Sequence, residues 1–385
     1  MRATDESLLN FCVELPAVPV EQLELSEFRR RLVGGSFPDY RRLSSALKGM
    51  KFLQADPIRA PARAQDLVLR QRVVQYAAGD LEEAFPKLKA EEGYLFAYGF
   101  MPPDVWQNLR WRPRGKLKKL EREVLDAVTQ HGEVHPRELD EQFGRKSVQN
   151  YWGGKSKETK RILENLHHHG YLRVSRRENG IRIYQVPSEA NYDSNAESAD
   201  PAERFRSLAL TTASVFGPTT KRFLVSELRS QKHLLPARAD RLAAVESLVE
   251  TGQLAEVEVD GVVYLWIRKQ WKPKDVPERV RILAPFDPLV RDRDRFTQVW
   301  DWTYRFEAYV PAAKRQRGYY AMPVLFKDQV VGWANAKVDN HVLHIEMGYA
   351  KKRPRPKLFR VLAEAEAEAI ATFLGLESGA WKLTL

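Results

Sequence analysis

The 385-residue sequence contains very little cysteine and no long apolar segment. Its single cysteine, Cys12, excludes a framework of intramolecular disulfides and a zinc finger. No run of about 18 apolar residues occurs, and the N-terminus lacks the apolar core of a signal peptide. These absences predict a soluble, cytoplasmic protein.

Motifs of nucleotide and serine-hydrolase chemistry are also missing. The sequence has no G-x-x-x-x-G-K-[ST] or G-x-G-x-x-G phosphate loop and no G-x-S-x-G elbow. The run His167-His168-His169 does not predict a metal site, because consecutive helical residues point about 100° apart and cannot converge on one ion. We therefore predict no metal site.

Positive charge and aromatic residues are plentiful. The chain has 62 Lys and Arg against 51 Asp and Glu, a net charge of +11, and its 17 Phe and 9 Trp exclude disorder for most of its length. Residues 281–360 alone carry 16 Lys and Arg against 8 Asp and Glu. Charge clustered in this way favours nucleic acid as the anionic partner. The basic stretch Arg110–Lys119 fits a solvated linker equally well.

Three stretches share one pattern, in which short helices precede a polar hairpin. In the clearest, the middle one, Leu117–Gln130 has an apolar face with helical spacing, and two alternating strands flank the turn Glu178-Asn179-Gly180. Three helices followed by a hairpin form a winged helix, whose third helix can enter a major groove. Winged helices also serve as protein-contact modules, and that alternative stays open here.

The pattern predicts an α+β fold with three tandem winged helix-turn-helix modules and a C-terminal antiparallel β domain. The predicted domains are a first module with a basic linker (residues 20–115), a second module (116–187), a linker (188–201), a third module (202–275) and the β domain (276–385). In the β domain we expect the strands Phe306–Val310, Gly318–Leu325, Gln329–Ala336 and His341–Met347, and a closing helix over Leu358–Leu374.

One short motif, Gln54-Ala55-Asp56-Pro57, carries candidate chemistry. Residues two apart in an extended segment point to the same face, and Pro57 supports that conformation at Asp56. An amide and a carboxylate on one face can hold a water molecule beside a negative charge. The pattern is also typical of an aspartate that caps a turn, and from spacing alone that is the more common interpretation.

Further motifs occur along the chain, most densely over residues 282–336. They are Gln54-Ala55-Asp56-Pro57-Ile58, Ala62-Arg63-Ala64, Ala284-Pro285-Phe286-Asp287-Pro288-Leu289 with Asp292-Arg293, Phe306-Glu307-Ala308-Tyr309, Pro311-Ala312-Ala313-Lys314-Arg315, Gly318-Tyr319-Tyr320-Ala321-Met322-Pro323 and Val331-Gly332-Trp333-Ala334-Asn335. With these motifs, nearly the whole chain resembles the winged-helix DNA glycosylases of bacteria of the AlkZ/YcaQ type.

The resemblance implies catalytic residues and a substrate. A Gln-x-Gln or Gln-x-Asp pair is catalytic in that family, and Gln54 and Asp56 match the Gln-x-Asp form of the YcaQ branch. The implied activity is that of a monofunctional DNA glycosylase, which removes N7-alkylated purines and unhooks interstrand crosslinks in duplex DNA without metal or cofactor. The stretch Tyr98-Gly99-Phe100 departs from the family pattern, because a histidine usual there is absent. This departure bears on the preferred lesion.

Cationic side chains on the middle module and in the β domain are predicted to hold double-stranded DNA. They are Lys155, Lys157, Lys160, Arg161, Arg176, Arg177, Arg291, Arg293, Lys314, Arg315 and Arg317. The rival interpretation is a non-enzymatic transcriptional regulator with tandem winged helices. Regulators commonly dimerise, whereas this sequence has no coiled-coil heptads and is expected to act as a monomer. A nuclease is disfavoured, because Asp292 and Asp294 alone are poor metal ligands.

Overall fold

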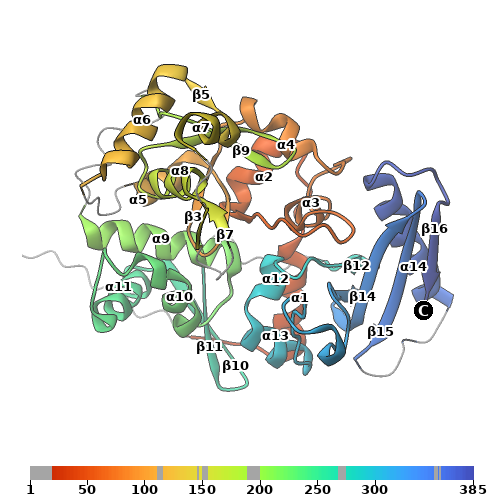
Figure 1. Cartoon of the computed structure of the whole chain (residues 1–385). Helices are drawn as coiled ribbons and strands as arrows, with labels where there is room; N and C mark the ends of the chain where they lie inside the picture. Colours follow the sequence, from red (N-terminus) through yellow and green to blue (C-terminus); the bar gives the residue numbers. More distant parts are fainter. Residues whose placement is uncertain are drawn as a thin grey trace, which may run out of the picture.

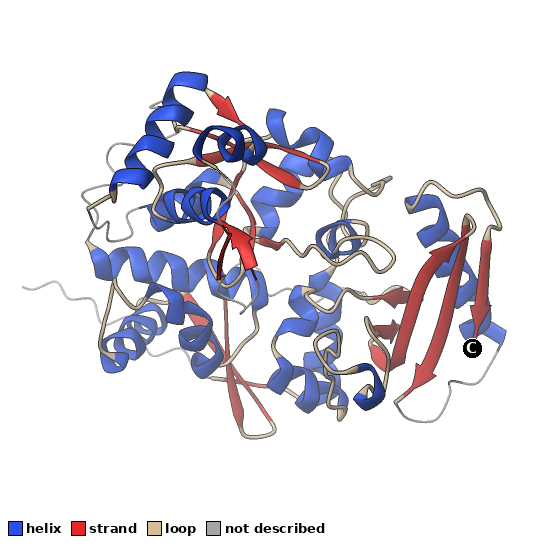
Figure 2. Ribbon diagram, in the orientation of Figure 1, coloured by secondary structure: helices blue, strands red, loops and turns tan. Residues whose placement is uncertain are grey.

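The chain folds into several small sheets, each with its own helices, and a larger sheet near the C-terminus (Figure 1, Figure 2). The computed structural model describes residues 20–110, 116–144, 147–149, 155–188, 200–267, 275–350, 354 and 357–385. Helices and strands alternate along these residues, which confirms the predicted α+β class. Cys12, most of the predicted linker and residues 111–115 of the basic stretch lie outside the described residues.

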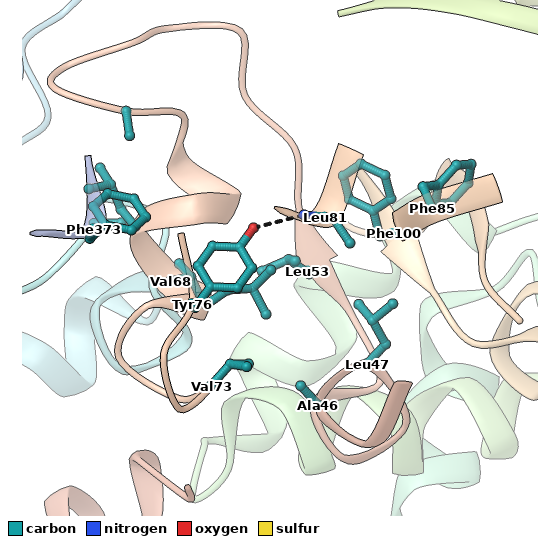
Figure 3. Packing of buried hydrophobic residues seen from close by; sticks show 14 of the residues in the cluster. Ala46, Leu47, Leu53, Val68, Val73, Tyr76, Leu81, Phe85, Phe100 and Phe373 are labelled. Atoms are coloured by element: carbon teal, nitrogen blue, oxygen red, sulfur yellow. Dashed lines mark hydrogen bonds between the residues drawn. The ribbon is translucent and has the colours of Figure 1, made fainter. Parts of the chain in front are cut away.

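The N-terminal segment builds a three-stranded sheet that contains Gln54. Its strands are β2 (Leu53–Gln54), β3 (Glu91–Tyr94) and β4 (Tyr98–Met101), in the order β2-β4-β3. Its helices are α2 (Leu43–Met50), α3 (Ala64–Leu69), α4 (Asp80–Ala84), the 3₁₀ turn η1 (Phe85–Lys87) and α5 (Pro103–Arg110). The Tyr76 hydroxyl donates to Asp66 at 2.6 Å. It also accepts from the Leu81 N–H at 3.2 Å within the buried cluster that Figure 3 shows.

The first two elements of the chain pack against the third segment instead. Helix α1 (Leu25–Ser36) buries Phe28, Leu32 and Val33 in a cluster with side chains of the hairpin formed by β10 (Leu254–Val259) and β11 (Val262–Ile267). Strand β1 (Glu21–Gln22) pairs in parallel with β10. The beginning of the described chain thus contributes to a sheet formed more than two hundred residues later.

The middle segment holds three helices and a twisted hairpin. Its helices are α6 (Lys119–His131), α7 (Pro136–Phe143) and α8 (Glu158–His168), and its strands are β5 (Glu133–Val134), β6 (Ser147–Gln149), β7 (Lys155–Lys157), β8 (Arg173–Glu178) and β9 (Ile181–Gln185). Strands β5, β9 and β8 form one antiparallel sheet. The turn falls at Asn179 and Gly180, with φ of 50° and 83°, as expected for an Asn-Gly hairpin.

The third segment repeats helices followed by a hairpin. Its helical elements are α9 (Pro201–Phe216), α10 (Lys221–Glu227), the 3₁₀ turn η4 (Leu228–Gln231) and α11 (Arg238–Glu250), and its strands are β10 (Leu254–Val259) and β11 (Val262–Ile267). Asp200 caps α9, since its side chain accepts the Glu203 N–H. The hairpin turns at Asp260-Gly261 and extends from the body of the molecule (Figure 1).

The C-terminal segment has a five-stranded sheet in the order β12-β13-β14-β15-β16. Its elements are β12 (Val280–Ile282), α12 (Pro288–Arg291), α13 (Arg293–Trp300), the 3₁₀ turn η5 (Ala312–Lys314), β13 (Met322–Phe326), β14 (Gln329–Asp339), β15 (Val342–Tyr349), α14 (Lys357–Phe373) and β16 (Trp381–Thr384). Helix α14 packs its apolar face on this sheet.

Two predictions for this segment were wrong. The sheet is not fully antiparallel, because β16 pairs in parallel with β15 after the crossover through α14. The segment Phe306–Val310 is a turn rather than a strand. Its Glu307 is buried and accepts the N–H groups of Gln316 and Arg317, at 2.9 and 2.8 Å, so this carboxylate closes a loop where a sheet partner was expected.

Buried ion pairs join the N-terminal and C-terminal segments. Arg72 donates to both oxygens of Asp287, at 2.7 and 2.9 Å, and the Asp287 side chain is fully buried. Asp287 also accepts the Leu289 N–H and thereby caps α12, with Pro288 at the first helical position. The Phe-Asp-Pro motif therefore sets the position of α12 relative to the sheet that contains Gln54.

Candidate active site

The backbone at Gln54 is extended, as predicted, and Asp56 lies two residues beyond the end of strand β2. Gln54 lies opposite Gly99 in the β2–β4 ladder, and the Ala55 N–H donates to the Tyr98 carbonyl at 2.9 Å. The strands approach closely, because a Cβ at Gly99 would lie 2.4 Å from the Leu53 carbonyl oxygen. The stretch that departs from the family pattern, Tyr98-Gly99-Phe100, is therefore the strand on which Gln54 rests.

Asp56 follows the strand and its side chain is 8% exposed. Its Oδ1 accepts the Ile58 N–H at 2.9 Å, so one oxygen caps the turn, as expected for an aspartate with a turn-capping role. Among the described residues, no Lys or Arg forms an ion pair with this carboxylate, and no hydrogen bond reaches its second oxygen. Burial raises the pKa of the Asp56 carboxyl, and the Ile58 N–H offsets this only in part.

Gln54 is half-buried and its side chain is held by an arginine. Arg291, the last residue of α12, donates from Nη1 to Gln54 Oε1 at 2.9 Å and from Nη2 to Glu227 Oε2 at 3.0 Å. Glu227 ends α10, so the three side chains come from three distant parts of the chain. Burial raises the pKa of the Glu227 carboxyl, and the adjacent Arg291 cation opposes that shift.

Aromatic residues of the loop before β13 lie close to Asp56. Partial burial and the negative charge of Asp56 both raise the pKa of the Tyr309 and Tyr320 hydroxyls. Tyr320 is buried, whereas Tyr309 is 80% exposed, the largest exposed fraction among the large apolar side chains described. Phe306 packs between them, with ring centroids 6.0 Å from Tyr309 and 5.3 Å from Tyr320. An exposed aromatic ring thus lies within electrostatic reach of a nearly buried carboxylate.

Several of the predicted DNA contacts lie on the surface. Lys160 and Arg161 are exposed on α8, and Lys314 is exposed at the end of η5. Arg315 and Arg317 are partly buried, and each donates to a backbone carbonyl and lies over an aromatic ring. These five cations have no carboxylate partner in the described part of the chain.

Other predicted DNA contacts have partners within the protein. Lys157 pairs with Asp140 at 2.5 Å, and Arg176 pairs with Glu133 and Glu178. Lys155 belongs to β7, and its side chain is outside the described atoms. Lys157 and Arg176 remain partly exposed, at 38% or more of the side chain, so a phosphate could replace their present partners.

Two further predicted DNA contacts, Arg177 and Arg293, are partly buried and have partners within the protein. Arg177 donates to both oxygens of the fully buried Glu92, at 2.8 and 2.6 Å, and so fastens the hairpin β8–β9 to β3. Arg293 donates to the carbonyls of Val290 and Pro285 and lies over the Tyr304 ring, and burial lowers its pKa to about 10. Both guanidinium groups are partly buried and bonded within the protein, so they are less available to DNA than the exposed cations of α8.

Sequence reasoning missed the partner of Gln54. It placed Arg291 among the DNA contacts and did not consider Glu227, because their neighbourhood depends on packing between residues 237 and 64 positions apart. The dense motifs around Phe286–Asp292 were the only signal. Tyr309 lies in another such motif, but its exposure beside Asp56 was not predictable from the sequence.

In the described part of the chain, no group of three His, Cys, Asp or Glu side chains could hold a metal ion. A search of the same residues for a helix long and apolar enough to cross a membrane finds none.

Comparison with known proteins places the chain among DNA repair enzymes of the glycosylase class. A family model described as "DNA glycosylase AlkZ-like" matches residues 47–373, and the chain therefore belongs to this AlkZ-like family. In fold it is similar to the DNA glycosylase AlkZ of Streptomyces sahachiroi, with a TM-score of 0.62 over 93% of this chain and 99% of that one. The sequence identity is 13%, so this match concerns the fold alone. Membership of the family confirms the expected DNA glycosylase and its DNA partner.

Proposed function

We propose that the protein excises N7-alkylated purines and unhooks interstrand crosslinks, with Asp56 as general base and Gln54 as the group that orients the water. The observation that carries the proposal is the nearly buried Asp56 carboxylate, which lies two residues after Gln54 and has no cation partner among the described residues. A buried carboxylate without a cation costs stability, and such groups are concentrated at functional sites.

The proposed reaction needs little help at the leaving group. A purine alkylated at N7 is already cationic, so it departs as a neutral base when the electrons of the N-glycosidic bond move onto it. The sugar becomes positively charged, and a water oxygen forms the new bond to C1′ while its proton moves to Asp56. A carboxylate beside the sugar stabilises the positive charge and accepts this proton, as in other glycoside hydrolyses. The products are a free base and an abasic site.

We propose that the three helix-and-hairpin segments act as winged helices on one duplex. The order of helices and hairpin in the middle segment supports this interpretation, as do the exposed cations of α8. A crosslinked base is tethered to both strands and cannot rotate fully out of the helix, so the site must accept a lesion that stays within the duplex. Tyr309, exposed and within electrostatic reach of Asp56, is suited to packing against such a lesion.

The direct test incubates the protein with a duplex that carries one N7-methylguanine, and separately with a mustard-crosslinked duplex, in EDTA. Heat or alkali then reveals abasic sites as strand breaks. We expect breaks at the lesion in both substrates and none in undamaged DNA. Tight binding without product would instead favour a non-enzymatic winged-helix regulator, and activity that disappears in EDTA would contradict a metal-independent mechanism.

The excision rate is expected to rise with pH through a pKa above the ordinary Asp value of about 3.9. The base must be ionised to act, and burial raises the pKa of the Asp56 carboxyl. Single-turnover rates measured across acidic to neutral pH, with spontaneous depurination subtracted, check this expectation. A rate that is constant across that range would argue against a carboxylate as the base.

Replacing Lys160 and Arg161 together by Ala should flatten the salt dependence of DNA binding. Each phosphate contact contributes a slope of about −0.9 in a plot of log affinity against log salt, so the loss of two contacts removes roughly 1.8 units. Fluorescence anisotropy with duplex DNA measures the slope. Lys119→Ala is a control, because Lys119 is also exposed but is not a proposed contact. Equal slopes for the double variant and the control would remove both residues from the DNA surface.

A further inference from the structure

We infer that Arg291 and Glu227 fix the amide of Gln54 in one orientation, so that Gln54 presents only N–H donors to the DNA. The inference rests on the proposed function and assigns a task to two side chains outside the Gln-x-Asp motif. Arg291 and Glu227 are positioning residues here, since they act through Gln54.

The orientation of the amide follows from the chemistry of its partner. A guanidinium group carries N–H donors and no acceptor, so the atom of the Gln54 amide that faces Arg291 must be the carbonyl oxygen Oε1. The Nε2 atom, with two hydrogens, then points away from Arg291. Among the described residues no acceptor occupies Nε2, whereas Oε1 is already bonded at 2.9 Å.

Arg291 is itself held firmly. It ends the short helix α12, which lies against α1, α9 and α13 in the centre of the molecule (Figure 1). The start of α12 is fixed by Asp287, whose buried carboxylate is bound by Arg72. The Arg291 side chain is 23% exposed and its fork is filled by Gln54 on one nitrogen and Glu227 on the other. A planar guanidinium with both ends bonded restricts the amide to one orientation.

The Glu227 carboxylate offsets the positive charge of Arg291. An unpaired guanidinium near the deoxyribose would oppose the positive charge that develops on the sugar. The Glu227 carboxylate, 3.0 Å from Arg291, offsets the cation, so the Asp56 charge dominates at the reacting centre. Arg291 therefore acts as a hydrogen-bond donor to Gln54 with little net charge of its own.

A donor at position 54 suits the attacking water. An N–H group that donates to the water oxygen leaves both water protons free, and one of them is directed to Asp56. An acceptor at position 54 would compete with Asp56 for those protons. The structure thus divides the work of the motif into a donor at Gln54 and an acceptor at Asp56.

Gln54→Glu separates this idea from simple charge stabilisation. A glutamate keeps the length of the side chain and its bond to Arg291 but has no N–H donor when ionised. We expect the single-turnover rate on N7-methylguanine duplex to fall by about 10²–10³-fold, the usual effect of losing one aligned donor, with unchanged DNA affinity. If Gln54 served only to lower the positive potential, the added negative charge would maintain or raise the rate, and that result would overturn the inference.

Arg291→Ala tests the positioning role. We expect a fall in the single-turnover rate without a fall in DNA affinity, and partial recovery of the rate when guanidinium ion is added at low, non-denaturing concentration. Arg291→Lys should have a single-turnover rate below that of the wild type, since a single ammonium cannot bridge Gln54 and Glu227 in the same plane. A merely structural role for Arg291 would lower the unfolding temperature and would not respond to guanidinium.

Glu227→Gln tests the same idea if the arginine variants do not fold. It keeps the size of the side chain and provides a neutral acceptor for Arg291. We expect it to slow excision, since the unscreened Arg291 cation then opposes the charge on the sugar. Full activity in Arg291→Ala would refute the positioning role, as would full activity in Glu227→Gln. Full activity in Gln54→Glu would by itself refute the donor role of Gln54. If the wild-type protein leaves both damaged duplexes intact, the proposed function itself is refuted. If the wild type and Gln54→Glu are both active, only the inference about Gln54 is refuted.

Discussion

Asp56→Asn is expected to lower the single-turnover rate of base excision by about 10²–10⁴-fold, the range typical of a positioned general base. Asn keeps the shape of the side chain and an oxygen that can accept the Ile58 N–H, so the turn after β2 should persist. The change removes the negative charge and the proton acceptor. The measurement is strand breakage at an N7-methylguanine after alkali, with enzyme in excess over DNA.

The stability of the variant makes this result interpretable. Burial raises the folded-state pKa of Asp56 above its unfolded value, so the folded protein binds the proton more tightly. The contribution of Asp56 to stability is therefore present at low pH and is lost as pH rises through the raised pKa. At neutral pH the ionised Asp56 lowers the stability, and Asp56→Asn should have a free energy of unfolding equal to or above that of the wild type.

DNA affinity provides the second control for this variant. Asp56 is nearly buried and repels phosphate, so its neutralisation should leave the affinity for undamaged duplex unchanged or slightly higher. Excision by Asp56→Asn at the wild-type rate would end the assignment of Asp56 as the base. Lost activity together with lost stability would point to a structural role.

Arg72→Met is expected to destabilise the protein by about 3–5 kcal/mol, the usual cost of leaving one member of a buried ion pair without its partner. The Asp287 side chain is 0% exposed, so its carboxylate has no contact with water. It is bound instead by two guanidinium nitrogens of Arg72, at 2.7 and 2.9 Å. Met fills a similar volume but donates no hydrogen bond. Arg72 also donates to the carbonyls of Ser36 and Val68, at 3.0 and 3.1 Å, so contacts with α1, α3 and the C-terminal segment are lost together.

Two comparisons give this prediction its meaning. Lys119→Ala removes an exposed pair with Glu123, 3.9 Å apart, and should change the free energy of unfolding by about 0–1 kcal/mol. The double variant Arg72→Met, Asp287→Leu removes both charges and should recover part of the loss, although α12 then lacks its cap. Urea denaturation followed by tryptophan fluorescence measures all of them. A loss in Arg72→Met no larger than that in Lys119→Ala would show that the pair does not join the two segments.

The two predictions are linked through α12. Because Asp287 sets the start of this helix and Arg291 ends it, a weakened Arg72–Asp287 pair should also disturb the orientation of Gln54. The stability of the junction between the N-terminal and C-terminal segments thus bears on the geometry of the candidate site.

Local patterns in the sequence were sufficient for much of the secondary structure. The hairpin turns at Asn179-Gly180 and Asp260-Gly261 follow from the left-handed conformations that these residues adopt easily, and the structure has both. The amphipathic helices α6 and α14 follow from apolar residues at helical spacing. The extended conformation of Gln54 was predicted from the spacing of the motif, and the structure has it in strand β2. Each of these features depends on residues within one or two turns of each other.

The tertiary structure decided which charged groups face outward and which meet inside. Arg176 and Arg177 are neighbours in one strand, yet the first is partly exposed and the second is enclosed with Glu92. Arg291 and Arg293 belong to one alternating run, but the first reaches Gln54 across 237 residues and the second is bonded to nearby carbonyls. Strand β16 is parallel only because α14 carries the chain back along the sheet. The sequence by itself therefore determined the local backbone and the Gln-x-Asp pair, because short-range sterics and periodicity act along the chain. The partners of each charge depend on which remote segments pack together, and only the folded structure supplies them.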